Sequence, residues 1–346
     1  YSFVMMSLRG AGDSKTPFYF LLLSVGLDIV LTPAFIFGFG PIPKMEIAGA
    51  ATATLIANVI SLAAIGWHLY RRQHFLWLRG DELRYLRIDI RILRALVGKG
   101  VPMGLQMVVI SSSMIVMISL VNRFGSQTTA AFGAAMQVWN YIQMPAFAIS
   151  AAVSSMAAQN VGAGLWDRVG RTAMTGIAVN FLMSGSLIAL IWLLQRHAFG
   201  LFLPDDSTAV AIAMHMNGIV IWAYLFFGVS MVLSGVVRST GAVMPPLIIL
   251  FIAFWAVRIP FAYGLVDRFG ADAIWWSYPL GAVVSLAMTM AYYRWGNWRS
   301  ARMLDDASAL PENVTGAASP AAAIESEAAT LPAAGGDANL TRRTDS

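Results

Sequence analysis

Asp28 is an acidic side chain within an otherwise apolar stretch that runs from Pro17 to Gly38. A carboxylate in the lipid hydrocarbon is costly unless it faces a cavity or a partner, and such acids usually serve ion or substrate pathways. Asp28 is therefore a candidate for binding a proton or a cation whose release accompanies transport. The alternative is a structural acid that pairs with a hydroxyl or with Arg258, which lies in a later apolar stretch.

Arg258 has two interpretations of its own. It could bind an anion or a carboxylate, or it could extend towards the outer membrane interface. Because long basic side chains bury their stems and keep their charged heads in water, we expect Arg258 to snorkel.

Uncharged amides inside the apolar stretches form a second set of candidates for a ligand cavity. They are Asn58, Gln106, Gln137, Asn140, Gln143 and Asn180. Gln137 and Asn140 are three residues apart and so share one helical face, to which Met136 and Met144 would add a pliable apolar surface. The alternative is hydrogen bonding between helices, worth about 0.6–2 kcal/mol per bond. Taken singly, each amide favours this structural role.

The chain lacks the residue sets that support most catalytic and metal chemistry. It has no cysteine, and its four histidines form no i, i+4 pair of the kind that binds a metal on a helix. We therefore expect no enzymatic activity and no cofactor or bound metal. The only inorganic partner expected is a coupling ion, H⁺ or Na⁺.

Composition predicts an all-α polytopic membrane protein. Hydrophobic residues make up 58% of the chain, charged residues only 12%, and the mean hydropathy is +0.67. A span of the bilayer needs roughly 20 apolar residues, and the start of the chain, YSFVMMSL, is shorter and is expected to end a ninth helix. The eight predicted spans are 17–39, 47–70, 97–122, 128–156, 172–194, 209–235, 244–266 and 271–293.

Basic residues predict the orientation in the membrane. The connection between the second and third spans is rich in arginine, whereas each loop on the opposite side has a single basic residue, so this connection is cytoplasmic. The net charge of +5 thus reflects membrane orientation rather than nucleic-acid binding. Residues 73–96 are expected to form an amphipathic linker on anionic lipids, and 301–346 a disordered cytoplasmic tail. We expect an integral protein of a bacterial inner membrane, with its C-terminus in the cytoplasm.

The two ends of the membrane part resemble each other, as in transporters built from repeats. The matching residues, each 229 positions apart, are Arg9 with Arg238, Gly12 with Gly241, and Pro17 with Pro246. Six-helix repeats would make a twelve-helix protein with two lobes. In that arrangement residues 1–72 are the last part of the first lobe and residues 97–300 are the second lobe.

The block from Leu8 to Pro17, LRGAGDSKTP, closely resembles the LRGxGDTxTP signature of multidrug and toxic compound extrusion (MATE) transporters. The segments from Phe37 to Thr54 and from Ala158 to Gly164 are similar to two further motifs of that family, and Arg238 with Gly241 fits a weaker echo. The motif and hinge residues are Arg9, Gly10, Gly12, Asp13, Pro17, Pro33, Gln159, Asn160, Gly162, Gly164, Arg238 and Gly241. The resemblance implies two six-helix lobes around a V-shaped cavity. It also implies antiport of amphipathic, often cationic, compounds against H⁺ or Na⁺ by alternating access.

The glycines and prolines have a mechanical interpretation. Gly10, Gly12, Gly162, Gly164 and Gly241 are expected to permit tight turns just past helix ends. Pro33, Pro102, Pro145 and Pro260 can bend their helices because proline removes a backbone hydrogen bond.

The chain also departs from the family pattern. The place of Asp28 usually holds Asn in the family, and the acids that some members carry in the seventh and tenth helices are missing from 97–122 and 209–235. One rival function is a flippase of lipid-linked saccharides from the same superfamily, which would need a basic cavity and a side groove. A second rival is a non-transporting membrane protein, such as a sensor or a decayed lobe.

Overall fold

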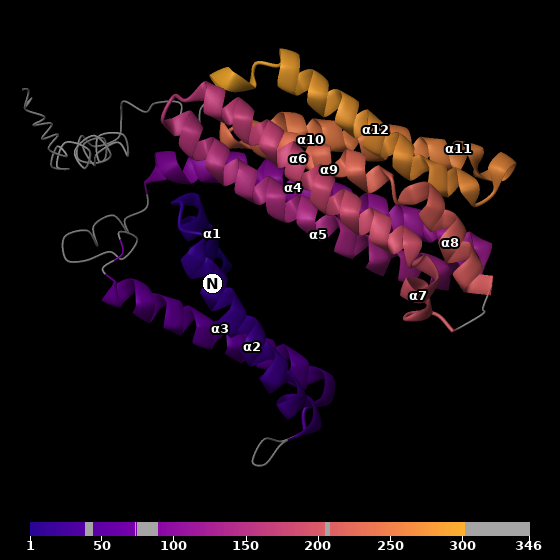
Figure 1. The fold of residues 1–346 in the computed structure, drawn as a ribbon, viewed down its shortest axis with the longest axis horizontal. Coiled ribbons are helices and arrows are strands. Elements are labelled where there is room, and N and C mark those ends of the chain that lie inside the picture. The colour runs from indigo at the N-terminus through magenta and orange to yellow at the C-terminus, as the bar shows by residue number, and fades with distance from the viewer. Residues whose placement is uncertain (39–43, 73, 75–88, 205–207, 302–346) are drawn as a thin grey trace, which may run out of the picture.

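The computed structural model describes residues 1–38, 44–72, 74, 89–204 and 208–301, and all of their regular structure is helical. Figure 1 shows two groups of helices that diverge from a contact near the end of the first helix. The first group contains α1 (Ser2–Gly10), α2 (Lys15–Phe37) and α3 (Glu46–Arg71). The second group contains α4 (Ile90–Val121), η2 (Asn122–Phe124), α5 (Ser126–Gly162), α6 (Trp166–Leu193), α7 (Gln195–Gly200), α8 (Thr208–Val220), α9 (Ala223–Ser239), α10 (Met244–Phe251), the π-helix η3 (Ile252–Arg258), α11 (Ile259–Phe269), α12 (Asp272–Trp295) and η4 (Trp298–Ser300).

The predicted membrane spans are confirmed among the described residues. Seven helices are long and apolar enough to cross a bilayer, and an eighth span results if α8 and α9 are taken together. These two helices meet at an angle of 46°, which the sequence did not indicate because no proline lies between Thr208 and Ser239. The expected continuous span over 209–235 is therefore a broken one.

The start of the second group differs from the expected boundary near residue 97. The Asp89 carboxylate accepts a hydrogen bond from the N–H of Arg91 at 2.8 Å, so α4 begins at Ile90. The end of the expected linker is thus the first part of a spanning helix. Residues 73 and 75–88 of that linker, and residues 302–346 of the expected tail, lie outside the described residues.

The second group has an aromatic core that α9 crosses. Trp139 of α5 and Trp275 of α12 are fully buried, and both contact the ring of Phe132. The Trp139 indole donates to Oδ1 of Asn217 at 3.0 Å, which ties α5 to α8. Since α9 packs against α5, α6 and α12, nearly all of its residues are buried.

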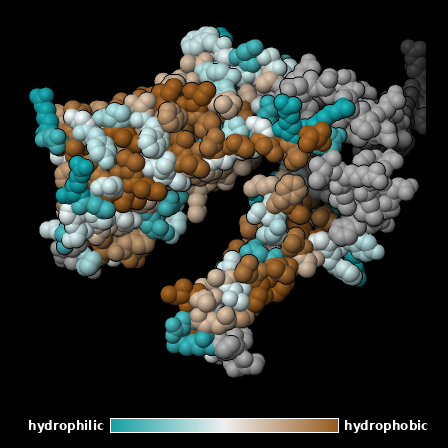
Figure 2. Space-filling model, turned by 180° about the vertical axis from the view of Figure 1, so that it is seen from behind, coloured by the Kyte–Doolittle hydropathy of each residue, from teal (hydrophilic) through white to brown (hydrophobic). Residues whose placement is uncertain are grey.

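The first group has a smaller core and wide apolar faces. Met5 and Leu8 of α1 pack on Ile65 and Leu69 of α3, while α2 and α3 lie along each other. Many apolar side chains of α2 and α3 remain exposed, and Figure 2 shows such side chains on both groups and an open wedge between them. Apolar faces of this kind are suited to hydrocarbon rather than to water.

The motif glycines divide into two kinds. Gly12, Gly164 and Gly241 have φ angles of +94°, +72° and +92°, so they make the expected turns. The same expectation is wrong for Gly10 and Gly162. Each is the last residue of its helix, α1 or α5, and neither has a positive φ, because the turn is made by a later glycine.

Candidate transport site

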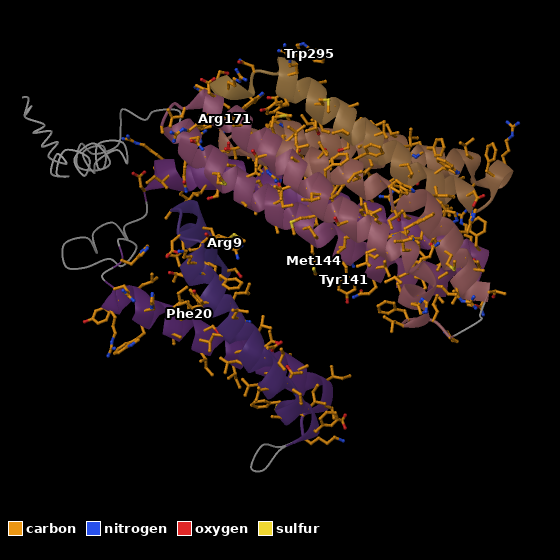
Figure 3. The ribbon with its side chains drawn as sticks, viewed as in Figure 1. Arg9, Phe20, Tyr141, Met144, Arg171 and Trp295 are labelled. Atoms are coloured by element: carbon orange, nitrogen blue, oxygen red, sulfur yellow. The ribbon has the colours of Figure 1, made fainter. Side chains whose placement is uncertain are left out.

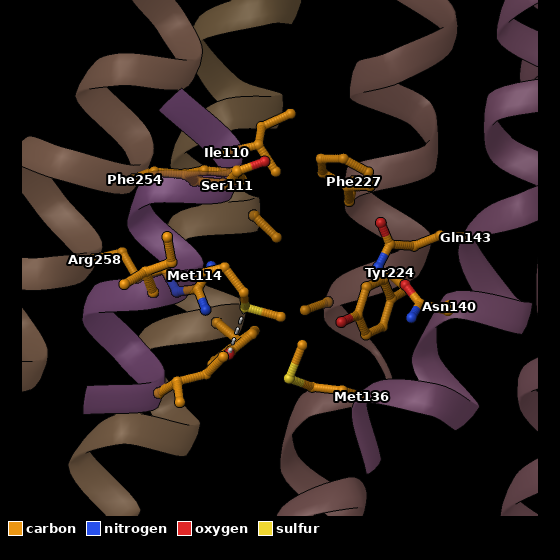
Figure 4. A pocket seen from close by; sticks show the side chains of 15 residues that line it. Ile110, Ser111, Met114, Met136, Asn140, Gln143, Tyr224, Phe227, Phe254 and Arg258 are labelled. Atoms are coloured by element: carbon orange, nitrogen blue, oxygen red, sulfur yellow. Dashed lines mark hydrogen bonds between the residues drawn. The ribbon is translucent and has the colours of Figure 1, made fainter. Parts of the chain in front are cut away.

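A cavity of about 380 Å³ lies inside the second group. It is lined by residues of α4, α5, α9, η3 and α12, and Figure 4 shows it from close by. Its lining residues are Ile110, Ser111, Met114, Ile115, Ile118, Met136, Asn140, Gln143, Ala223, Tyr224, Phe227, Phe254, Arg258, Tyr278 and Ala282. The lining is mostly apolar with a few polar groups, which is the usual character of a small-molecule site.

The polar groups of the cavity lie on two opposite walls. Arg258 comes from η3 on one wall, while Asn140, Gln143 and Tyr224 come from α5 and α9 on the other (Figure 4). Met114 lies between them. A ligand with a polar group at each end and an apolar middle would match this distribution.

Arg258 is buried, with 6% of its surface exposed, so the expectation that it snorkels is wrong. Its guanidinium carbon lies 3.5 Å from the centroid of the Tyr278 ring and 5.5 Å from that of Phe254. The stem of the side chain packs against Gly281 of α12, where an added Cβ would lie at an ordinary contact distance of 3.4 Å from the Arg258 Cβ. A desolvated cation–π contact contributes about 2 kcal/mol, which offsets part of the cost of burying the charge.

Two nitrogens of that guanidinium, Nε and Nη2, are buried and have no hydrogen-bond partner among the described residues. Arg258 is also the last residue of a π-helical segment, and Pro260, which has no N–H to donate, follows in the first turn of α11. Short π segments inside α-helices are frequent at functional sites.

The cavity opens between α4 and α5. Ser111, Ile115 and Asn140 line it and are exposed, so this wall is not closed by protein. Figure 3 shows Tyr141 and Met144 on the side of α5 that faces α2 and α3. The opening therefore leads to the wedge between the two groups.

Asp28 lies on α2 in the first group and does not contact Arg258. Its Oδ1 accepts hydrogen bonds from Thr54 Oγ1 at 2.9 Å and from Thr32 Oγ1 at 3.4 Å. The alternative of a structural pairing with a hydroxyl is therefore present in the structure, whereas the expected pairing with Arg258 is wrong. The nearby Asn58 donates to the Thr54 carbonyl of its own helix at 2.9 Å. The arrangement brings a carboxylate and two hydroxyl oxygens together on a partly exposed face.

The predicted amides separate into cavity and packing positions. Asn140 and Gln143 reach the cavity with Met136, whereas Gln137 and Met144 are exposed and do not line it. Gln137 donates instead to the Tyr141 hydroxyl at 3.4 Å.

The other two amides are buried in helix contacts. Gln106 accepts from Arg238 Nη1 at 3.2 Å and donates to the Val243 carbonyl at 3.4 Å. Asn180 fills the space that Gly228 leaves, because a Cβ at Gly228 would lie 2.5 Å from its Nδ2.

The motif residues form the contact between the two groups. Ser155 Oγ of α5 donates to the Arg9 carbonyl at 2.7 Å, and Gln159 Nε2 donates to the Gly10 carbonyl at 3.4 Å. Gly12 allows this approach, since a Cβ there would lie 3.1 Å from Gln159 Nε2. The last carbonyls of α1, which have no partner within their own helix, are thus bound by side chains of α5.

Asp13 caps the helix that follows this contact. Its Oδ1 accepts from the N–H groups of Lys15 and Thr16 at 3.1 and 3.0 Å, at the start of α2. Desolvation alone would raise the pKa of the Asp13 carboxyl, but hydrogen bonds from Thr16 and Lys15 and the nearby His74 outweigh it and lower the pKa.

A second groove, of about 680 Å³, lies between α5 and α6. Asn160, which was singled out in the sequence, lines it together with Arg168 and Arg171, both of which are exposed. The Asn160 amide donates to the Met156 carbonyl of its own helix at 2.8 Å. The groove thus has a basic rim near the contact between the groups.

The MatE family model matches residues 102–264. The probable multidrug resistance protein YoeA of Bacillus subtilis (strain 168) is 38% identical over 289 residues, which are 83% of this chain and 62% of that protein. The chain belongs to the MATE family. A second B. subtilis relative, the probable multidrug resistance protein YpnP, is 32% identical over 314 residues, 88% of this chain and 66% of that protein. The chain spans less than two thirds of the length of these curated relatives.

The fold agrees with solved MATE structures. A MATE crystal structure in the straight conformation has a TM-score of 0.75 and 22% identity, and the match covers 84% of this chain and 64% of that chain. An outward-facing MATE transporter of the MOP superfamily has a TM-score of 0.74 and 22% identity, with 83% and 63% covered. The all-α, two-lobe fold class is thereby confirmed. The family model and the curated relatives, not these structures, assign the chain to a family of transporters rather than enzymes.

Several residues of the cavity were not predicted from the sequence. Phe254 and Tyr278 contact Arg258, and Tyr224 faces it across the cavity (Figure 4). Phe254 lies four residues before Arg258 in η3, whereas Tyr224 and Tyr278 come from other helices. Each lies in an ordinary apolar stretch, and no local pattern distinguishes it from an aromatic residue of the core.

Proposed function

We propose that the protein exports amphipathic small molecules by secondary active transport, in exchange for H⁺ or Na⁺. The observation that carries this proposal is the cavity inside the second group, which opens towards a wedge between two helix groups joined by a small contact. Alternating access requires two bodies that can rock about a shared contact around a binding site. The curated relatives YoeA and YpnP are called probable multidrug resistance proteins, which supports export of varied compounds.

The cavity lining supports an amphipathic substrate. Met114 and Met136 are flexible and polarizable, so they can adapt to different apolar shapes. Asn140 and Gln143 provide hydrogen-bond donors and acceptors without a fixed charge. Such a combination binds diverse compounds because its shape adjusts and its polar groups accept either partner.

We place the ion coupling at Asp28. A carboxylate with Thr32 and Thr54 hydroxyl oxygens nearby can hold a proton or a small cation. In the predicted orientation, the contact at Arg9 and Ser155 lies on the cytoplasmic side of a bacterial inner membrane. The wedge then faces outwards, and protonation or ion binding at Asp28 would favour one of the two access states.

Efflux of ethidium, which is a cation, and of dansylglycine, which is an anion, from drug-sensitive cells tests this proposal. The complete gene is compared with its Asp28→Asn variant and with Asp267→Asn, which changes an exposed acid at the end of α11. We expect efflux from the complete gene, loss of efflux with Asp28→Asn, and no change with Asp267→Asn. Unchanged efflux with Asp28→Asn would remove the coupling role. No efflux from the complete gene would favour a flippase or a non-transporting protein.

A further inference from the structure

We infer that the cavity around Arg258 binds amphipaths that carry an anionic group, such as a carboxylate or a sulfonate, and that Arg258 holds this group. The inference rests on the proposed function, since it specifies which amphipaths the exporter takes. The inference also extends the proposed function. Family resemblance alone implies compounds that are often cationic, whereas the charge of this cavity favours anionic compounds.

The charge of the cavity is the first argument. Arg258 is the one residue of the lining that carries a formal charge at neutral pH, and none of the lining residues is acidic. In surroundings of low polarity, a fixed positive charge attracts anions and repels cations far more strongly than it does in water. A cationic ligand would therefore meet an unfavourable potential in this cavity, and an anionic ligand a favourable one.

The geometry of the guanidinium is the second argument. Nε and Nη2, the two nitrogens without partners among the described residues, form the same edge of the guanidinium fork. One edge presents two parallel N–H groups, which match the two oxygens of a carboxylate or a sulfonate. Both nitrogens are buried at present, so a ligand reaches them when Arg258 rotates from the Tyr278 ring into the cavity that it lines.

A second arginine in the same bundle shows what a structural role looks like. Arg238 donates from Nη1 to Gln106 Oε1 at 3.2 Å and from Nη2 to Ser150 Oγ at 3.4 Å, so its guanidinium joins three helices. Buried polar groups that serve only packing are normally paired in this way. Nε and Nη2 of Arg258 are buried without such pairing among the described residues, and Arg258 lines a cavity, as expected of a group that binds a ligand.

The opposite wall fits the remainder of such a ligand. Asn140, Gln143 and Tyr224 face Arg258 across the cavity, with Met114 between them (Figure 4). An aromatic or aliphatic body can occupy the space next to the methionine, and an uncharged polar end can bond to the amides. The ligand class is thus an anionic amphipath of the size of a small fused-ring compound.

Binding of two matched fluorescent probes tests the inference. The purified protein in lipid nanodiscs is titrated with dansylglycine, which carries a carboxylate, and with dansylamide, which has the same ring system and no charge. The variants are Arg258→Met, which removes the charge, and Arg258→Lys, which keeps it but removes the fork. Arg268→Met is the matched control, because Arg268 is exposed on the same span and lies outside the cavity.

We expect dansylglycine to bind the unmodified protein about tenfold more tightly than it binds the Arg258→Met variant. This difference in affinity is equivalent to ~1.4 kcal/mol. Arg258→Lys should fall between the two, and dansylamide affinity should be the same in all four proteins. Equal affinity for dansylglycine in the unmodified protein and in a folded Arg258→Met variant would overturn the inference. If Arg258→Met does not fold, equal affinity of the unmodified protein for the two probes would overturn it as well.

The binding assay and the efflux assay separate the two proposals. Preference for dansylglycine without efflux of either ethidium or dansylglycine would support the anion site and remove the proposed export. Efflux of ethidium with no preference for dansylglycine would keep the export and remove the anion site.

Discussion

Gly12 and Gly241 stand 229 positions apart and make the same backbone turn. Their φ angles are +94° and +92°, and each donates its N–H to the carbonyl of an arginine three residues earlier, Arg9 at 3.1 Å and Arg238 at 2.9 Å. The matching prolines, Pro17 and Pro246, are both buried in the first turn of the next helix. The repeat seen in the sequence is therefore also a repeat in backbone geometry.

The first prediction concerns this turn. Gly241→Ala should lower stability by about 1–2 kcal/mol, because a side chain at positive φ clashes with the backbone. Gly264→Ala is the control, since Gly264 lies inside α11 and a Cβ there meets nothing within 4 Å. Thermal unfolding in detergent, followed by circular dichroism, should show a lower Tm for Gly241→Ala alone. Equal Tm values for both variants would contradict the prediction.

The second prediction concerns the contact between the helix groups. Ser155→Ala removes the bond from Ser155 Oγ to the Arg9 carbonyl, which is worth about 0.5–1.5 kcal/mol. The conformation in which the first and second helix groups are in contact at Arg9 and Ser155 should therefore become less populated. Because the chain contains no cysteine, spin labels on Leu55→Cys and Met144→Cys, both exposed, report the distance between the groups.

The control for this measurement is Ser186→Ala, which removes a hydroxyl that bonds only within its own helix, to the Leu182 carbonyl at 2.6 Å. The control should leave the distance distribution unchanged, while Ser155→Ala should broaden or shift it. A distribution identical to that of the unmodified protein would show that the Ser155 bond does not hold the groups together.

The third prediction concerns the buried bond between Trp139 and Asn217. Trp139→Phe leaves Oδ1 of Asn217 without its donor inside the core, which costs about 1–3 kcal/mol. Trp276→Phe changes the same side chain at a position that is 57% exposed, and should have little effect. The two Tm values in detergent test the difference, and a Trp139→Phe protein as stable as Trp276→Phe would refute it.

The fourth prediction is a pH dependence at Asp13. Hydrogen bonds in the folded protein lower the pKa of its carboxyl below the usual value, so the unfolded chain takes up the proton at higher pH than the folded protein. The stabilisation by Asp13 is therefore complete above roughly pH 4 and is lost as the pH falls through the lower, folded pKa. Tm differences between the unmodified protein and Asp13→Ala should be clear at pH 7 and should shrink in acid. A difference independent of pH would contradict the role of the charge.

Much of the architecture could be predicted because its causes are local. A span requires an apolar run of bilayer length, and the eight predicted runs match the described helices apart from their ends. The turns at Gly12 and Gly241 were also predictable, since a positive φ strongly favours glycine. The bend between α8 and α9 was not predictable in this way, because no proline marks it.

The candidate site was predicted only in part. Asn140 was singled out as a polar residue in a helix and does line the cavity, but Gln137, one turn earlier, does not. The position of a residue along a helix shows which neighbours share its face, but not which face meets another helix. Asn180 and Gln106 were equally good candidates in the sequence and became packing residues in the structure.

The membrane class, the spans, the repeat and the family could be predicted from the residues alone, because hydropathy, turn glycines and signature residues act over short distances. The place of Arg258 depends instead on packing between helices. An arginine in a spanning helix can extend to the interface or stay inside, and the choice depends on what packs beside it. Here its stem packs against Gly281 and Tyr278 stacks on its guanidinium, and both residues belong to α12, the membrane span after its own.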